Sequence, residues 1–262
     1  MAADITNAVS AYDATTGAPI NPTLVTGLEY AHQMCVADGA LYVTSAPDMV
    51  RSQRGLIGKY NATTGAPLNP TLVDNKIINM EGMAVVGNRL YVAALDRRVR
   101  VYDTTSGAAV GGGFSCAFAA PSTLLLVGDH FLIPDYLGGR VAAYDASTGK
   151  SVNAFSIQGI PQAQDIVFSE GALYILSRNG TVGKYDAATL AVVNLALLLG
   201  LVEPSSIAVA HGTVYISTRA DNTVATYDAR TGRRLNPTLI EGLTSPWSLA
   251  VSGNTLYVMQ HR

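Results

Sequence analysis

A six-residue box beginning at Tyr12 constrains this chain more than any other feature, because it recurs throughout the sequence. The first copy reads Tyr-Asp-Ala-Thr-Thr-Gly. Later copies begin at Tyr60, Tyr102, Tyr144, Tyr185 and Tyr227. Successive copies are 48, 42, 42, 41 and 42 residues apart, and the interval across the two chain ends is 47 residues. A fixed period near 42 that carries short strands is typical of a β-propeller or a solenoid.

Each repeat contains four short segments rich in Val, Ile and Tyr, separated by Gly, Asn and Asp. Such segments are typical of strands joined by hairpins. No sustained apolar pattern at helical spacing interrupts them. The sequence therefore predicts an all-β chain, a six-bladed β-propeller with four-stranded blades, whose strands we name A to D from the centre outward.

The whole chain, 1–262, is expected to form one propeller domain. It begins with a C and a D strand that have no inner partners, and it ends with an A and a B strand that have no outer ones. We expect the N-terminal pair to complete the last blade, which closes the ring without a long exposed sheet edge. The predicted blades are blade 1 near 28–73, blade 2 near 78–114, blade 3 near 120–156, blade 4 near 162–197, blade 5 near 203–240, and blade 6 near 245–262 together with 7–25.

Composition argues against two classes of partner. Only 14% of the residues are charged and the formal net charge is −2, so there is no basic field for nucleic acid. Apolar runs such as 195–199 are too short to span a bilayer, and the first seven residues lack the features of a signal peptide. We expect no nucleic-acid partner and no membrane partner, favour a monomer, and leave the compartment open.

The box itself has a mechanical interpretation. Its Asp accepts hydrogen bonds from backbone N–H groups two residues on, and its Gly supplies the positive φ that ends the turn. The preceding Tyr is expected to lie between neighbouring blades. One copy has Leu190 in place of the glycine, and we expect that turn to close differently and more loosely.

The candidate site is the mouth of the central channel, on the face that carries the D–A and B–C connections. The strands repeat strictly, yet the residues at this mouth differ in nearly every blade, which favours a binding role. His32 and Glu81 fall in adjacent blades and are the candidate acid–base pair. Trp247 would supply an apolar wall for a ligand. The candidate ligand-binding residues are Gln33, Ser122, Asp135, Tyr136, Gln164, Asp165, Arg178, Ser205, Arg219, Trp247 and His261.

Blade 1 contains the one marked departure from the period. From Val43 to Tyr60 it has 17 residues where the other complete blades have 10 or 11, and the extra length is 46–54. Long loops inside regular scaffolds are often functional.

The repeat resembles the NHL-like six-bladed propellers. The resemblance rests on the Pro-x-Ser-Ile/Leu-Ala-Val motifs at 204–209 and 246–251 and on the Leu-Tyr-Val strand. Relatives in that broad group include the SMP-30/gluconolactonase-like lactonases, whose Glu-Gly motif is similar to Glu81-Gly82. This resemblance implies a divalent metal (Ca, Mg or Zn) held by Glu81 and Asp165, although the sequence requires no metal. Virginiamycin B lyase-like propellers share a similar rhythm of strands and turns but have seven blades.

Three functions remain open from the sequence. The leading hypothesis is a binding module that holds a small molecule or short peptide at the channel mouth. The alternative is a cofactor-free or metal-assisted enzyme at the same place, a lactone hydrolase, lyase or cyclase that uses His32 and Glu81. The third is a recently duplicated repeat scaffold without an evolved pocket, because 16–25 and 64–73 differ at only one position.

Overall fold

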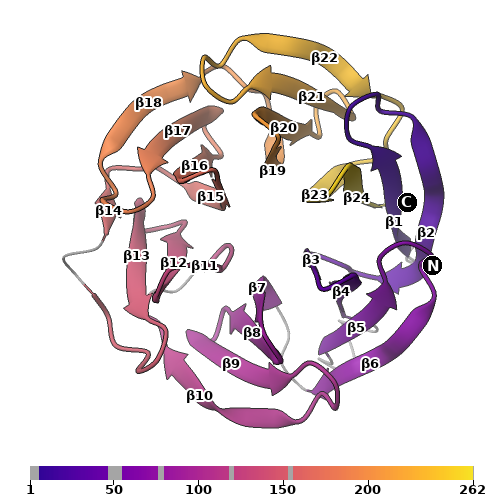
Figure 1. Ribbon diagram of the computed structural model, residues 1–262, viewed down its shortest axis with the longest axis vertical. Helices are drawn as coiled ribbons and strands as arrows, with labels where there is room; N and C mark the ends of the chain where they lie inside the picture. The colour runs from indigo at the N-terminus through magenta and orange to yellow at the C-terminus, as the bar shows by residue number, and fades with distance from the viewer. Residues whose placement is uncertain (1–5, 47–54, 76–79, 118–120, 153–155, 262) are drawn as a thin grey trace, which may run out of the picture.

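The computed structural model describes residues 6–46, 55–75, 80–117, 121–152 and 156–261. These residues form six antiparallel four-stranded sheets around one central axis (Figure 1). The expectation of an all-β, six-bladed propeller is confirmed. None of the described residues forms a helix that could cross a membrane. Most of the extra segment in blade 1, 47–54, lies outside the described residues.

The strands follow the order A to D outward in every blade. Blade 1 contains β3 (Met34–Ala37), β4 (Ala40–Ser45), β5 (Gly55–Asn61) and β6 (Pro67–Asn75). Blade 2 contains β7 (Met80–Val86), β8 (Arg89–Ala94), β9 (Arg98–Asp103) and β10 (Ala109–Ser115). Blade 3 contains β11 (Leu125–Val127), β12 (His130–Asp135), β13 (Arg140–Asp145) and β14 (Ile157–Gln158). Blade 4 contains β15 (Ala163–Ser169), β16 (Ala172–Ser177), β17 (Thr181–Asp186) and β18 (Val192–Leu198). Blade 5 contains β19 (Pro204–Ala210), β20 (Thr213–Thr218), β21 (Thr223–Asp228) and β22 (Arg234–Ile240). Blade 6 contains β23 (Pro246–Ser252), β24 (Thr255–His261), β1 (Thr6–Asp13) and β2 (Pro19–Glu29).

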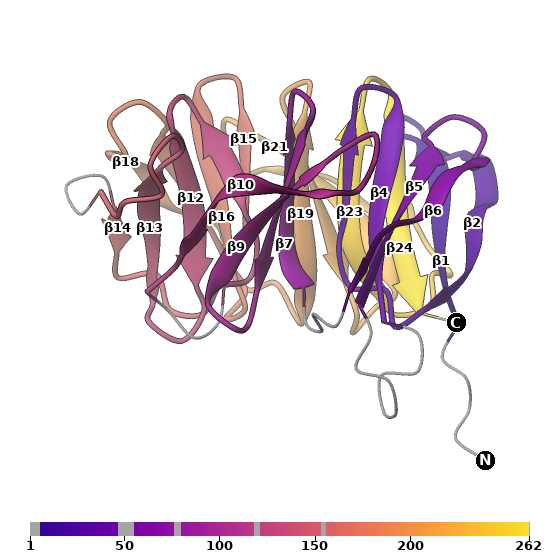
Figure 2. The same ribbon diagram turned by 90° about the horizontal axis from the view of Figure 1, so that it is seen from below.

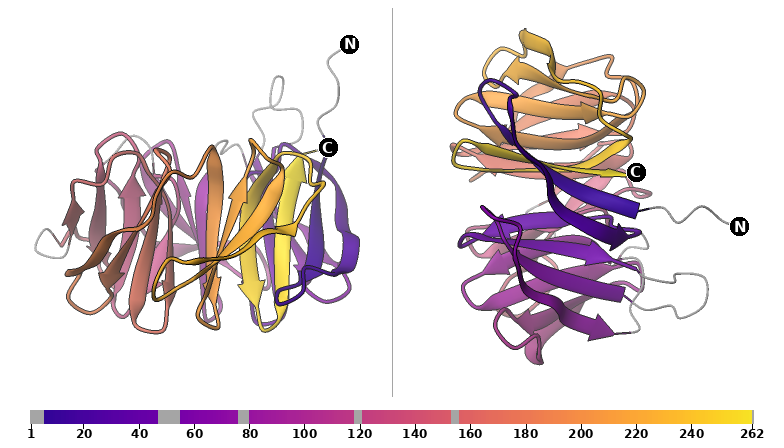
Figure 3. Two further views of the ribbon diagram at one scale, coloured as in Figure 1. Left: turned by 90° about the horizontal axis from the view of Figure 1, so that it is seen from above. Right: turned by 90° about the vertical axis from the view of Figure 1, so that its right-hand side faces the viewer.

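Blade 6 is assembled from both ends of the chain, as expected. β1 pairs with β24 in unbroken register from Asn7↔His261 to Asp13↔Thr255. Within this pairing Gln260 Nε2 donates a hydrogen bond to Ser10 Oγ at 2.8 Å. The right panel of Figure 3 shows β1 and β2 between the C-terminal strands and blade 1. The ring therefore has no open edge between its first and last repeats.

The core is divided among the blade interfaces. Six clusters of buried apolar side chains lie between neighbouring blades, one cluster at each interface. A B strand faces two such clusters, and β16 is buried at every position. This explains why the Leu-Tyr-Val segment repeats so closely. Figure 2 shows the sheets edge-on, with the start of β1 and the end of β24 at one face of the disc.

The box forms the same turn between strands C and D in each blade. In blade 3, Asp145 Oδ1 accepts hydrogen bonds from Ser147 N at 3.2 Å and Thr148 N at 2.7 Å. Gly149 N closes the turn on the Asp145 carbonyl at 2.8 Å. Hydrogen bonds from the Thr148 and Ser147 hydroxyls and from these N–H groups lower the pKa of Asp145 to about 2.

The box glycine also sets the contact between blades. Gly65 has φ +73°, and a Cβ there would overlap the carbonyl oxygen of Leu24, on the D strand of the preceding blade. The same overlap with a leucine carbonyl would arise at Gly17, Gly107 and Gly232. Glycine is therefore required both for its positive φ and because the neighbouring backbone leaves no room.

The expectation for Leu190 is wrong. Leu190 adopts φ +59°, and its N–H bonds to the Asp186 carbonyl at 2.8 Å, as the glycines do. Its side chain is 9% exposed and packs in the cluster that contains Ile157 and Ile160. The D strand β14 of the preceding blade is only two residues long, and the leucine side chain fills space beside it. Packing thus offsets the cost of the left-handed conformation.

Two glycine-to-alanine substitutions separate backbone strain from blade contact. Gly39 has φ +71°, and no atom lies within 4 Å of the place a Cβ would take, so Gly39→Ala meets only the strain of positive φ, about 1–2 kcal/mol. Gly65→Ala adds a steric conflict with the neighbouring blade and is expected to cost about 3 kcal/mol or more. Urea unfolding of both variants measures the difference. Equal losses of unfolding free energy would contradict the close-approach argument.

The turn aspartates predict an acid-sensitive contribution to stability. A carboxyl whose folded pKa is depressed stabilises the fold above its unfolded pKa, near 3.9, and loses that effect as the pH falls toward about 2. Asp145→Asn removes the titration but retains an acceptor, because Asn61 makes the equivalent bonds in blade 1. The melting temperature of the wild type relative to Asp145→Asn should therefore fall between pH 4 and pH 2. A constant difference over that range would refute the argument.

Candidate functional site

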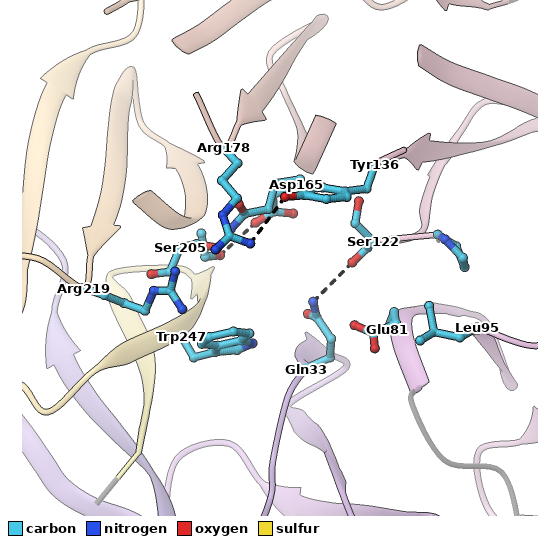
Figure 4. A pocket seen from close by; sticks show the side chains of 13 residues that line it. Gln33, Glu81, Leu95, Ser122, Tyr136, Asp165, Arg178, Ser205, Arg219 and Trp247 are labelled. Carbon is cyan, nitrogen blue, oxygen red and sulfur yellow. Dashed lines mark hydrogen bonds between the residues drawn. The ribbon is translucent and has the colours of Figure 1, made fainter. Parts of the chain in front are cut away.

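A cavity of about 260 Å³ lies on the central axis, where the starts of the A strands and the ends of the B strands converge (Figure 4). Every blade contributes at least one residue to its wall. The lining residues are Gln33, Glu81, Leu95, Pro121, Ser122, Tyr136, Gln164, Asp165, Arg178, Ser205, Ser206, Arg219 and Trp247.

Irregularities in strand pairing place four of these residues at the mouth. The A–B ladder skips one residue at the start of strand A in blades 2, 4, 5 and 6. The skipped residues are Glu81, Gln164, Ser205 and Trp247. A bulge leaves its extra residue outside the ladder and redirects the side chain. The four side chains therefore line the cavity, while the strands behind them keep their register.

A second set of residues is fixed by the backbone of the D–A connections. Arg178 N donates a hydrogen bond to the Gln162 carbonyl, and Arg219 N donates one to the Glu203 carbonyl, each at 3.1 Å. Gln162 and Glu203 both have positive φ, 52° and 44°. Arg178 and Arg219 are each the first residue after a B strand. The strained connections thus hold the backbone of both arginines, and their side chains extend toward the axis.

Polar side chains connect successive blades around the cavity. Ser122 Oγ donates to the Ala163 carbonyl at 3.1 Å, which joins blade 3 to blade 4. Gln164 Nε2 donates to the Ser205 carbonyl at 2.6 Å, and Ser205 Oγ donates to the Pro246 carbonyl at 2.6 Å. Each of these bonds reaches a backbone carbonyl at the start of the A strand in the next blade.

Asp165 is bonded to protein groups rather than directed only at the cavity. Its Oδ2 accepts hydrogen bonds from Ser206 Oγ at 2.8 Å and Ile207 N at 3.1 Å, and its Oδ1 accepts one from Ile166 N at 2.9 Å. Burial raises the pKa of Asp165 to about 6, and these three hydrogen bonds act in the opposite direction. Asp165 therefore links blade 4 to blade 5 and carries a carboxyl whose pKa is raised to about 6.

Trp247 is held by three neighbouring groups. The His261 ring stacks on it at a centroid distance of 5.2 Å, and the His32 ring meets it edge-on at 6.0 Å. The Arg219 guanidinium lies 4.9 Å from the Trp247 ring centroid. Burial lowers the pKa of both histidines, and the cationic Arg219 lowers that of His261 further. The indole thus forms a fixed wall of the cavity.

Glu81 and the two arginines carry the unpaired charge of the cavity. In the described parts of the chain, Glu81 forms no hydrogen bond or ion pair, and burial raises its pKa. Arg178 makes one long hydrogen bond, from Nη1 to Tyr136 Oη at 3.4 Å. Among the described residues no group of three or more His, Cys, Asp or Glu side chains is close enough to hold a metal ion. Glu81 and Asp165 both line the cavity, and their assignment as metal ligands stays a prediction.

The sequence matches the profile of the PQQ_2 family, described as outer membrane protein assembly factor BamB, over residues 6–238. The chain belongs to this family. No curated protein matches the sequence significantly.

The solved structures that share this fold have low sequence identity to the chain. The crystal structure of BamB from Moraxella catarrhalis is 15% identical, with a TM-score of 0.53 over 99% of this chain and 92% of that one. The computationally designed Ika8 protein is 14% identical, with a TM-score of 0.56 over 93% of this chain and 76% of the other. The expectation of a propeller repeat protein is confirmed. The particular resemblance to NHL-like and SMP-30/gluconolactonase-like propellers is not supported by these comparisons.

The structure brings together most of the residues expected at the mouth. Ten of the thirteen candidate residues line the cavity, and three do not. His32 and His261 lie behind the lining, against Trp247. Asp135 is buried and accepts hydrogen bonds from Gly138 N at 3.0 Å and Arg140 Nε at 3.2 Å, so it closes the B–C turn of blade 3. In the part of the chain that is described, no hydrogen bond joins His32 to Glu81, and their acid–base pairing stays a prediction.

Three lining residues were not among the candidates. Leu95 and Ser206 stand at mouth positions of the repeat but offer no titratable group. Pro121 has a signal that alignment of the repeats would have revealed, because Pro121-Ser122 matches Pro204-Ser205 at the start of strand A. In the structure Pro121 bridges to Asp135, as Pro204 pairs with Thr218.

The raised pKa of Asp165 predicts the opposite pH dependence from the turn aspartates. A carboxyl whose folded pKa is raised stabilises the fold most below its unfolded pKa, near 3.9, and this effect is lost as the pH rises through about 6. The melting temperature of the wild type relative to Asp165→Asn should fall between pH 4 and pH 7. Carbon-detected NMR titration of the Asp165 carboxyl provides a direct check. A carboxyl that titrates near 4 would contradict the assignment.

Proposed function

We propose that this propeller is a binding module whose central cavity holds a small molecule or short peptide. The observation that carries the proposal is the lining itself, because all six blades contribute to one cavity and the set of side chains differs from blade to blade. Trp247 offers an apolar wall, while Arg178, Arg219 and Glu81 offer charges that have no ionic partner among the described residues. An apolar surface with a few convergent polar groups is the usual composition of a ligand site.

Family membership supports binding rather than chemistry. The family description names an assembly factor and no reaction. The candidate catalytic pair gains no support from geometry, because His32 packs against Trp247 and is absent from the cavity lining. A general acid or base must come within hydrogen-bond reach of the reacting group. We therefore propose binding alone.

The proposal is tested by a thermal-shift screen of the full chain. The compounds are amino acids, short peptides, sugars and lactones, together with divalent metals in the presence and absence of EDTA. A ligand at about 100 times its Kd stabilises the folded state by about 2.7 kcal/mol, which raises the melting temperature of a domain of this size by about 5 °C or more.

The site is then located with matched aromatic variants. Trp247→Ala should weaken binding of the hit at least tenfold in calorimetry. Phe168→Ala removes an aromatic ring that is 47% exposed and lies outside the cavity, so it should leave the Kd unchanged. The melting temperature of each variant without ligand controls for misfolding. A screen without any hit, or a hit whose Kd is unchanged in Trp247→Ala, would refute the proposal.

A further inference from the structure

Apart from Asp165 of blade 4, whose oxygens are hydrogen-bonded to protein groups, the charges of the cavity are segregated by blade. Arg178 and Arg219 come from blades 4 and 5, which are neighbours, whereas Glu81 comes from blade 2. In a ring of six, blade 2 lies opposite blade 5. Figure 4 shows the two arginines on one side of the cavity and Glu81 on the other. A ligand across the axis therefore meets positive charge at one end and negative charge at the other.

The described structure leaves both ends without an ionic partner. Arg219 contacts the Trp247 ring, and its Nε is buried without a hydrogen bond. In the described residues Asp165 forms no ion pair with either arginine, and its oxygens accept bonds from Ser206, Ile207 and Ile166. A buried polar group without a partner carries a desolvation cost that a ligand with the complementary group removes.

Polar side chains line part of the space between the two ends. Gln33 Nε2 donates a hydrogen bond to the Ser122 carbonyl at 3.4 Å, and in Figure 4 Gln33 stands between Glu81 and the arginine side. A cavity of about 260 Å³ lies below the range of about 300–1,000 Å³ typical of drug-sized ligands. The occupant is therefore small, with polar groups along its length.

We propose that the cavity binds a di- or tripeptide with free termini, with its carboxylate on Arg178 and Arg219, its ammonium on Glu81, and a side chain against Trp247. Guanidinium groups match carboxylates through paired N–H donors, which favours Arg at the carboxylate end. At the other end, the Glu81 carboxylate accepts hydrogen bonds from the ammonium group of the peptide. This inference rests on the proposed binding function and specifies its ligand class.

Four forms of one peptide test the two ends separately. The probes are Gly-Phe-Gly with free termini, its C-terminal amide, its N-acetyl form, and the doubly blocked form. Calorimetry with the full chain should show at least tenfold weaker binding for each singly blocked form. Arg219→Gln should abolish the discrimination against the amide but not that against the acetylated form, and Glu81→Gln should do the reverse.

Two further variants keep the result interpretable. Arg230→Gln changes an exposed arginine in the C–D turn of blade 5, outside the cavity, and should leave all four affinities unchanged. Arg219 packs on the Trp247 ring, so Arg219→Gln can lower the melting temperature. In that case Arg178→Gln repeats the test of the carboxylate end.

The outcomes distinguish this inference from the function on which it rests. Equal affinity for all four forms would overturn the inference while leaving a binding module in place. Binding of another compound class without any peptide binding would do the same. If no compound in the screen binds, both proposals fail. Loss of discrimination at the matching terminus in each variant supports the inference.

Discussion

The contact on which the ring depends is the approach of each box turn to the D strand of the preceding blade. A single missing Cβ, as at Gly65, lets a turn lie against the carbonyl oxygen of Leu24. Gly17, Gly107 and Gly232 make the same contact with a leucine carbonyl, so at four of the six box turns it fixes how closely neighbouring blades pack at their outer edges. The apolar clusters between blades are then filled to a common spacing.

The bulges at the starts of the A strands explain how a strict repeat carries a varied mouth. A residue in the ladder is constrained by its cross-strand partner and by the clusters on both sheet faces. A bulged residue such as Glu81 or Trp247 is outside the ladder, so substitution there leaves the register unchanged. The mouth can therefore diversify residue by residue while the blades remain alike, which is what the sequence shows.

The sequence alone predicts the features that depend on period and alternation. The spacing of the boxes gives the number of blades, and the unmatched end strands give the closure of blade 6. Alignment of the repeats gives the mouth positions, since a position in the repeat determines a place in the ring. The orientation of a side chain at such a position depends on its neighbours, which often come from other blades. The sequence alone does not predict these orientations. The His32 ring packs against Trp247, which belongs to blade 6. Asp135 accepts a hydrogen bond from Arg140 within the B–C turn of its own blade.

Leu190 shows the same limit on the outside of the ring. A turn rule that considers only local conformation predicts a looser corner, because leucine disfavours positive φ. The structure keeps the turn, since the short β14 beside it leaves space that the side chain fills. Local rules thus fail where a neighbouring repeat is irregular.

Ring geometry also explains why the charges in the cavity do not neutralise one another. Two oppositely charged side chains on adjacent blades could approach and pair, but Glu81 and Arg219 extend from opposite blades and are each anchored by the backbone. Glu81 is held at a bulge, and the Arg219 backbone is bonded to the Glu203 carbonyl. The attraction between them persists across the channel without collapse of the cavity. Fixed charges that cannot reach each other retain their full capacity to select a ligand, because no internal ion pair must break when the ligand binds.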